Sequence, residues 1–241
     1  MRALILFPTL LALAAACASP ERQEAPNTLS ESRRRAGWEL VFDGRTTDGW
    51  RGYRQTSCPA GWQVIDGALT RVAEGGDLVT VDEYQDFVLE FEWRIAPGGN
   101  SGVMFHVTED HDAPWETGPE YQILDDAGHK DGLDPLTSAG SNYAMHAPTR
   151  AVAHPAGEWN QSRLSVVGTH VEHWLNGVEI VEYDLGSDDW NARVAACKWK
   201  DRPDYGKRSR GLIALQDHGD RVAYRSLRLL RTRPATVSGG R

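Results

Sequence analysis

The sequence predicts a single all-β domain built as an antiparallel β-sandwich. Short segments in which apolar and polar residues alternate recur along the chain, as in strands with one face in a core. Tight-turn sequences such as Asp66-Gly67 and Asn176-Gly177 separate neighbouring segments, and long helical patterns are scarce. With 241 residues, of which 40% are hydrophobic, the chain can bury one sizeable core. We expect this domain to cover residues 37–232.

Turn residues and alternation locate the strands in the first half of this domain. Asp66-Gly67 fits a type I′ turn, so the segments on either side of it form a hairpin. From Phe87 to Ile95 the apolar residues occupy every second position, which is typical of a strand with one buried face. The strands expected here cover residues 38–42, 62–65, 68–71, 77–81, 87–95, 101–107 and 120–125.

Two irregular segments interrupt the second half of the domain. Residues 127–153 contain Gly and Pro and show little periodicity, and loops of this length in compact domains are usually lids or binding loops. Residues 188–210, rich in Trp, Lys and Asp, are expected to hold a short helix near 190–198. The strands expected around these segments cover residues 158–167, 170–175, 178–183, 211–216 and 222–230.

The N-terminus has the features of a secretory signal. Arg2 precedes an apolar run that ends in small residues before Cys17, and the run is too short for a membrane span with its own flanks. It is similar to a bacterial lipoprotein signal, in which Cys17 is acylated and becomes the mature N-terminus; ordinary secretion with cleavage nearby is the alternative. Residues 1–16 are then the signal peptide, residues 17–36 a polar tether, and residues 233–241 a disordered tail.

Composition narrows the compartment and the partners. The signal predicts a protein of the bacterial cell envelope, held by lipid alone at the periplasmic face of the outer membrane. The formal net charge of −8 argues against nucleic acid as a partner. Nine Trp residues give mild support for a carbohydrate ligand, although core packing is the commoner explanation for any single Trp. Cys58 and Cys197 could pair or stay free, and neither has the spacing partners of a zinc site.

The strand expected at 120–125 carries the main candidate for a site. Successive side chains of a strand point to opposite faces, so Glu120 and Gln122 share one face. A carboxylate and an amide side by side in a mostly apolar strand suit the floor of a polar cleft. The alternative is that both simply face water from a half-solvated antiparallel sheet.

Short motifs spread over residues 38–230 establish a likeness to a known family, through their order and spacing. The motifs are Leu40-Val41-Phe42-Asp43-Gly44, Trp62-Gln63-Val64, Phe91-Glu92-Trp93-Arg94, Asn100-Ser101-Gly102-Val103, Gly118-Pro119-Glu120-Tyr121-Gln122-Ile123-Leu124-Asp125, Gly157-Glu158-Trp159-Asn160, Leu175-Asn176-Gly177 and Gly211-Leu212-Ile213-Ala214-Leu215-Gln216-Asp217-His218-Gly219. In these motifs the chain resembles the 3-keto-disaccharide hydrolase domain family, which implies a concanavalin A-like jelly-roll sandwich. The family tends to have Phe-Arg-Asn where this chain has Tyr224-Arg225-Ser226.

The resemblance implies cleavage of glycosides that are already oxidised to a ketone at C3. The ketone acidifies the C2 hydrogen, a general base removes it, the glycosidic oxygen is eliminated, and water adds afterwards. Such a site needs a base of near-neutral pKa, donors for the developing oxyanion and an acid for the leaving group, but no pair of carboxylates at glycosidase spacing. Gln122 and Leu124 stand where a retaining jelly-roll glucanase would have further acidic residues. No cofactor is expected, and the expected partner is a small carbohydrate substrate.

Glu120 and His146 are the candidates for proton transfer. His146 follows Asn142-Tyr143 in the long irregular segment, and the alternative is a solvated loop histidine. The expected substrate contacts are Arg94, Asn100, Gln122, Asp125, Gln216 and His218.

Simpler explanations exist for some of these residues. Arg94 could pair with Glu92 or Glu120, and Gln216 could cap the final turn. A divalent metal is a less favoured option, for which the potential ligands are His106, His111 and Asp112. For the whole domain, the rival function is that of a non-catalytic, lectin-like carbohydrate-binding module, because this sandwich hosts many of those.

The lipoprotein signal predicts that lipid on Cys17 anchors the mature chain in its host. Cys17→Ala removes the thiol that is acylated, so this variant should be recovered in the soluble fraction and the wild type with membranes. Mass spectrometry of the mature N-terminus checks the modification. An unmodified first peptide that starts at another residue would contradict the prediction.

Overall fold

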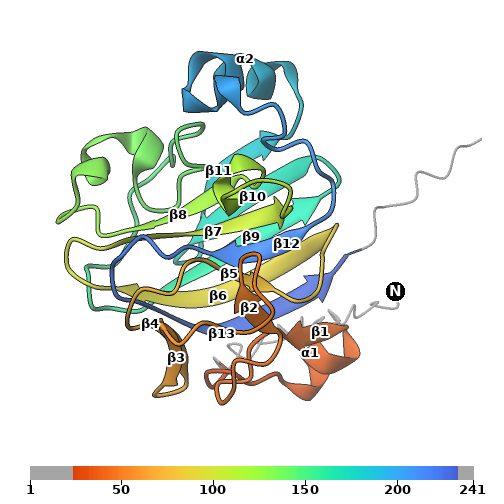
Figure 1. Ribbon diagram of the computed structural model, residues 1–241, viewed down its shortest axis with the longest axis vertical. Coiled ribbons are helices and arrows are strands. Elements are labelled where there is room, and N and C mark those ends of the chain that lie inside the picture. Colours follow the sequence, from red (N-terminus) through yellow and green to blue (C-terminus); the bar gives the residue numbers. More distant parts are fainter. Residues whose placement is uncertain (1–23, 233–241) are drawn as a thin grey trace, which may run out of the picture.

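Two antiparallel β-sheets packed face to face form the protein (Figure 1). The computed structural model describes residues 24–232. The larger sheet contains β1 (Trp38–Leu40), β3 (Trp62–Ile65), β4 (Ala68–Arg71), β6 (Phe87–Ile95), β9 (Asn160–Val167), β10 (His170–Leu175), β11 (Val178–Asp184) and β13 (Val222–Arg231). The smaller sheet contains β2 (Trp50–Gly52), β5 (Leu78–Thr80), β7 (Asn100–Val107), β8 (Glu120–Leu124) and β12 (Leu212–Leu215).

The strand order confirms the predicted antiparallel sandwich. In the larger sheet the order is β11-β10-β9-β6-β13-β4-β3, with β1 also paired to β13. In the smaller sheet it is β2-β5-β12-β7-β8. The helical elements among the described residues are α1 (Glu31–Arg35), α2 (Asp188–Ala196), and the 3-10 turns η1 (Pro114–Glu116), η2 (Lys130–Leu133), η3 (Pro135–Thr137) and η4 (Lys198–Asp201).

The element boundaries agree closely with the sequence pattern. The hairpin of β3 and β4 has the predicted bounds, and Asp66 and Gly67 have the positive φ angles of 50° and 75° that a type I′ turn requires. The expected helix near 190–198 begins earlier, at Asp188, because the Ser187 side chain accepts a hydrogen bond from the Trp190 N–H. β2 was not predicted, since a three-residue strand shows no alternation.

The core lies between the two sheets. Phe87, Leu89, Phe91, Trp93 and Ile95 of β6 are all at most 2% exposed, and they point into it as the alternation predicted. Full burial of such large side chains supplies the main driving force for folding.

The smaller sheet turns two side chains of β8 inward and two outward. Tyr121 and Ile123 are fully buried in the core, and the Tyr121 hydroxyl lies 2.9 Å from Ser162 Oγ of β9 in the opposite sheet. Because side chains alternate along a strand, Glu120 and Gln122 lie on the outer face of the smaller sheet.

Residues 24–36 pack against the domain, which corrects the predicted tether in the part that the structure describes. α1 begins at the capping residue Ser30, and Arg33 forms an ion pair with Glu90 of β6 at 2.5 Å. Arg228 of β13 donates a hydrogen bond to the Thr28 carbonyl at 2.9 Å. The pattern of Pro and charged residues concealed these contacts because they are made with residues far away in the sequence.

Asn27 joins this segment to two places in the larger sheet. Its side-chain amide donates to the Gly67 carbonyl at 2.7 Å and accepts from the Ser226 N–H at 2.7 Å. Ser226 has a φ of 55° and lies where the register of β13 against β6 shifts between Arg225 and Arg228. Ser226 is fully buried at this bulge and does not line the cavity described below, so its left-handed φ serves the geometry of the strand.

Some of the sequence predictions concern residues that the structure does not describe, and others are tested by it. The signal peptide, Cys17 and the tail fall outside residues 24–232 and remain predictions. Cys58 and Cys197 are both unpaired. Within the described part of the chain, no helix is long and apolar enough to cross a membrane.

Asn27→Ala should destabilise the fold by about 1–3 kcal/mol, because two side-chain hydrogen bonds of about 0.5–1.5 kcal/mol each are lost. Urea unfolding measures the change. Thr28→Ala is the matched control, since the exposed Thr28 hydroxyl bonds only to the nearby Ala25 carbonyl. Equal stability of the two variants would show that residues 24–36 do not depend on Asn27 for their docking.

Candidate active site

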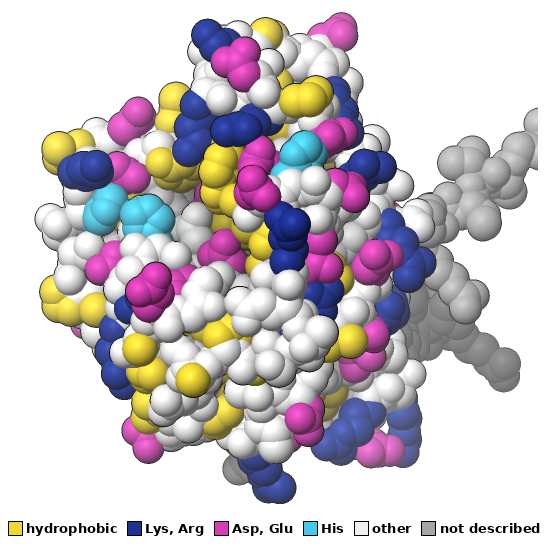
Figure 2. All heavy atoms as spheres, viewed as in Figure 1, with side chains coloured by type: hydrophobic (Ala, Val, Ile, Leu, Met, Phe, Trp, Pro, Cys, Tyr) yellow, Lys and Arg dark blue, Asp and Glu magenta, His cyan; other side chains and the backbone are white. Residues whose placement is uncertain are grey.

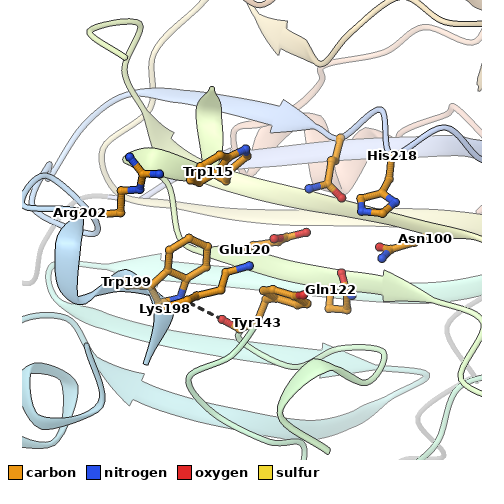
Figure 3. A pocket seen from close by; sticks show the side chains of 10 residues that line it. Asn100, Trp115, Glu120, Gln122, Tyr143, Lys198, Trp199, Arg202 and His218 are labelled. Carbon is orange, nitrogen blue, oxygen red and sulfur yellow. Dashed lines mark hydrogen bonds between the residues drawn. The ribbon is translucent and has the colours of Figure 1, made fainter. Parts of the chain in front are cut away.

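A cavity of about 350 Å³ opens on the outer face of the smaller sheet. Its floor comes from β7, β8 and the segment after β12, and its walls come from η1, the long loop before β9, and η4. Figure 2 shows that this face of the molecule is hollowed below α2. The lining residues are Asn100, Trp115, Glu120, Gln122, Tyr143, Lys198, Trp199, Arg202, Gln216 and His218 (Figure 3).

One end of the cavity is lined by side-chain amides. Gln122 donates through Nε2 to the Thr137 carbonyl at 3.3 Å, which leaves its Oε1 oriented toward the cavity. The buried oxygens Asn100 Oδ1, Gln122 Oε1 and Gln216 Oε1 accept no hydrogen bond from any residue in 24–232. Buried polar atoms normally have partners, so these three acceptors suit the hydroxyl groups of a ligand.

Glu120 forms the floor of the cavity and is only 4% exposed. Burial raises the pKa of its carboxyl group from the ordinary 4.5 to about 8, and the nearby charge of Lys198 opposes this rise. Asp77 and Asp131 add smaller repulsive contributions in the same direction as burial. A carboxyl group with a pKa near neutrality can both accept and release a proton at physiological pH.

The space for this carboxyl group depends on Gly102 of β7. Gly102 pairs with Gln122 across the two strands, and a Cβ atom at position 102 would overlap Glu120 Oε1. Any other residue at this position would push the carboxyl group out of its place on the floor.

Lys198 stands across the cavity from the amide end, partly open to solvent. Its Nζ atom lies 4.2 Å from the centroid of the Tyr143 ring and 4.4 Å from that of Trp199, so two cation–π contacts hold it. Figure 3 shows its ammonium group pointing toward Glu120. Partial burial lowers the pKa of Lys198, while the carboxyl groups of Glu120 and Asp131 act in the opposite direction.

Aromatic rings form the wall on the Lys198 side. The rings of Trp115 and Trp199 lie 6.2 Å apart, and Trp199 stacks on Tyr205 at 4.4 Å. The Arg202 guanidinium lies 4.9 Å above the Trp115 ring and donates to Glu116 at 2.7 Å. The partly exposed Trp115 ring can stack on a sugar ring or on an aglycone, whereas Trp199 is only 2% exposed and supports the wall.

The structure brings five of the eight predicted site residues together at this cavity. They are Asn100, Glu120, Gln122, Gln216 and His218. The alternative in which Glu120 and Gln122 simply face water does not describe them, because both are buried.

His146 does not line the cavity. Its ring stacks on Tyr183 at 4.8 Å, and its two nitrogens lie 3.0 Å from Asn142 Nδ2 and 3.2 Å from Asp189 Oδ2. Burial lowers its pKa, which favours the neutral ring. These contacts tie the loop that carries Tyr143 to α2, so His146 lies behind the wall of the cavity and supports it.

Arg94 and Asp125 also lie outside the cavity. Arg94 points outward from β6 in the opposite sheet and stacks on Trp159 at 4.8 Å, so it pairs with neither Glu92 nor Glu120. Asp125 is buried and accepts from the Gly98 N–H at 2.7 Å, which ties the turn between β6 and β7 to the end of β8.

Sequence reasoning missed the residues of the walls. Tyr143, Lys198, Trp199 and Arg202 come from the two irregular segments, and Trp115 comes from the loop before β8. These segments show no periodicity from which a side-chain direction can be derived. The one available signal was the density of Trp and Lys in residues 188–210.

The residues that suggested a metal have other partners. His111 Nε2 lies 2.8 Å from Asp204 Oδ2, and His106 Nε2 lies 2.7 Å from the Gln85 carbonyl. Within residues 24–232, no three His, Cys, Asp or Glu side chains are grouped so that they could hold a metal ion.

A β-sandwich with indole rings and free amide oxygens around one buried carboxyl group is typical of carbohydrate-active proteins. Residues 37–230 match the family described as the 3-keto-alpha-glucoside-1,2-lyase-like domain, and the chain belongs to this family. A protein of Bacteroides thetaiotaomicron named 3-keto-disaccharide hydrolase is 32% identical over 225 residues, which cover 80% of this chain and 78% of the relative.

Solved structures with a similar fold also come from proteins described as glycosyl hydrolases. A crystal structure from Parabacteroides distasonis, described as a glycosyl hydrolase, superposes with a TM-score of 0.81 at 37% identity and covers 87% of this chain and 100% of its own. A second one from the same organism, also described as a glycosyl hydrolase, has a TM-score of 0.67 at 26% identity, with coverage of 81% and 99%.

The raised pKa of Glu120 predicts a pH-dependent stability. Between pH values of about 4.5 and 8 the folded protein keeps a proton that the unfolded chain releases, so the free energy of unfolding falls as pH rises. The slope from this group is at most about 1.4 kcal/mol per pH unit. Glu120→Gln removes it, so the variant should gain stability over the wild type as pH rises through this window. Urea unfolding of both proteins at several pH values tests this, and parallel curves would show that Glu120 does not titrate there.

Proposed function

We propose that the protein cleaves glycosides that carry a ketone at C3, and that it does so by removing the C2 proton with Glu120. The Bacteroides relative named 3-keto-disaccharide hydrolase supports the substrate class. The single observation that carries the chemistry is the buried Glu120 carboxyl group, with a pKa of about 8, on the floor of the cavity.

The chemistry follows from the ketone. A carbonyl group at C3 acidifies the hydrogen on C2, and a base removes it to give an enolate. The enolate then expels the glycosidic oxygen from C1 and leaves a double bond between C1 and C2. Addition of water across this bond releases the 3-keto sugar, and the sum of the steps is hydrolysis.

The site supplies what the first step needs. Glu120 accepts no hydrogen bond from the described residues, so its carboxylate is available to the C2 proton. A base works best when its pKa lies near the working pH, and the burial of Glu120 provides this. The free oxygens of Asn100, Gln122 and Gln216 can accept hydrogen bonds from the sugar hydroxyl groups and orient the ring.

A lectin-like module is the second candidate, because the same sandwich serves many binding proteins. Binding alone would be served by the amide oxygens and the indole wall. A binding module has no use for the buried Glu120 carboxyl group. Burial raises the pKa of this group to about 8, which lowers the stability of the fold at neutral pH. This difference favours an enzyme.

We also propose that the enzyme works at the bacterial cell envelope. The signal-like N-terminus and Cys17 support this location, and a small carbohydrate that has already been oxidised would be its substrate there.

Glu120→Gln should lower turnover of a 3-keto-glycoside by roughly 10²–10⁴-fold, because it removes the proton acceptor but keeps the shape of the side chain. Product release from a 3-keto-glucoside measures the rate. Glu179→Gln, on the exposed face of β11, is the matched control and should keep the wild-type rate.

Two results would contradict the proposal. A Glu120→Gln enzyme with near-normal turnover would show that Glu120 is not the base. Equal cleavage of the unoxidised glycoside by the wild type would rule out elimination, since the C2 hydrogen of that substrate is not acidic.

Calorimetry separates the enzyme from the lectin. Glu120→Gln should lose turnover and keep its affinity for the ligand if the protein is an enzyme.

A further inference from the structure

The elimination that we propose requires a second proton transfer besides the one at Glu120. The glycosidic oxygen would leave as an alkoxide, which is a poor leaving group, unless a nearby acid protonates it. Proton donation by a positioned side chain contributes roughly 10²–10⁴-fold in rate. The donor has to line the cavity and reach the glycosidic oxygen while Glu120 reaches the C2 hydrogen.

Besides Glu120, four side chains of the cavity carry an N–H or O–H group that could transfer a proton: Tyr143, Lys198, Arg202 and His218. Tyr143 is a poor candidate. The Tyr143 hydroxyl donates to Asp131 Oδ2 at 3.3 Å. Burial and the neighbouring carboxylates raise the pKa of Tyr143 to about 12, which makes it a weak acid.

Arg202 and His218 are placed less well. The Arg202 guanidinium donates to Glu116 at 2.7 Å, and the guanidinium group of arginine is in general too weak an acid to serve as a proton donor. His218 is exposed at the amide end, beside Gln216, where the free oxygens are arranged for the hydroxyl groups of the sugar.

Lys198 is close to Glu120, and its ammonium N–H groups have no hydrogen-bond acceptor among the described residues. Within the described part of the chain its ammonium group makes no hydrogen bond or ion pair, and Nζ is held by the rings of Tyr143 and Trp199 at 4.2 and 4.4 Å. The rings attract the charge and leave the N–H groups without an oxygen acceptor. Figure 3 shows the ammonium group of Lys198 pointing toward Glu120.

The surroundings of Lys198 also suit proton transfer. Partial burial lowers the pKa of its ammonium group, which makes it a stronger acid than a lysine in water. Its opening to solvent allows a water molecule to reach it for the hydration step.

We propose that Lys198 is the catalytic acid that protonates the glycosidic oxygen. Glu120 takes the C2 proton, and the electron pair of that C–H bond passes through the enolate to form the C1–C2 double bond. The C1–O bond breaks with its electron pair on oxygen, and that oxygen takes a proton from Lys198. The products are the free alcohol and an unsaturated 3-keto sugar, with Glu120 protonated and Lys198 neutral.

Hydration restores both groups by the reverse transfers. The neutral Lys198 amine takes a proton from a water molecule as the water oxygen bonds to C1. The Glu120 carboxylic acid returns its proton to C2. One water molecule is consumed in the whole cycle, and no oxidant or metal is needed to balance it.

This assignment also orients the substrate. The leaving group lies on the side of Lys198, against the partly exposed indole of Trp115, and the 3-keto ring lies over Glu120 toward the amide oxygens. The indole wall then contacts the part of the glycoside that departs.

Leaving-group dependence tests the assignment directly. Methyl 3-keto-α-glucoside has a leaving group that needs protonation, and 4-nitrophenyl 3-keto-α-glucoside has one that does not. Lys198→Met should lower kcat/KM roughly 10²–10⁴-fold for the methyl substrate and less than about 10-fold for the nitrophenyl substrate. Glu120→Gln should lower both, because both substrates need the base. Lys200→Met, two residues away and exposed, is the matched control and should change neither.

The other outcomes each overturn a separate statement. Equal losses on both substrates, or no loss on either, would show that Lys198 is not the acid. Recovery of the methyl substrate by Lys198→Arg would show that the residue contributes charge and not a proton. Failure of the wild type on both ketones would overturn the proposed function itself. Retained nitrophenyl turnover by Lys198→Met shows in the same assay that the variant is folded.

Discussion

The alternation of β8 between two environments is the constraint on which the site depends. Tyr121 is locked into the core, where its hydroxyl lies close to Ser162 and donates to the Trp174 carbonyl at 3.0 Å. With Tyr121 fixed, the period of two along a strand leaves Glu120 and Gln122 no position except the outer face. A slip of one residue would bury the carboxyl group between the sheets and expose Tyr121.

The burial of Glu120 is a second step, which the sheet alone does not produce. The outer face of a sandwich is ordinarily wet, and a carboxyl group there would keep its usual pKa. Walls contributed by the long loop and η4 enclose it instead, and Gly102 leaves the room that it occupies. The pKa of about 8 is therefore a property of the enclosure and not of the strand.

The enclosure is held in place by stacked rings that extend behind it. From Trp199 the column continues through Tyr205 and Trp190 to Tyr183 and His146, with neighbouring centroids 4.4–5.7 Å apart. Through Asn142 and Asp189, His146 then connects the loop of Tyr143 to α2. Such a rigid wall can keep the Lys198 ammonium group in one position relative to Glu120, as proton transfer requires.

The sequence alone predicted the direction of a side chain wherever that direction follows from the strand that carries the residue. The sandwich, the hairpin turns and the facing of Glu120 and Gln122 were all predictable, because alternation and turn sequences are short-range signals. Tertiary structure decided what lies opposite that face. Lys198 and Tyr143 reach Glu120 from irregular segments, Arg94 belongs to the opposite sheet, and His146 belongs behind the wall. Contacts between segments distant in the chain depend on packing, and packing leaves no period in the sequence.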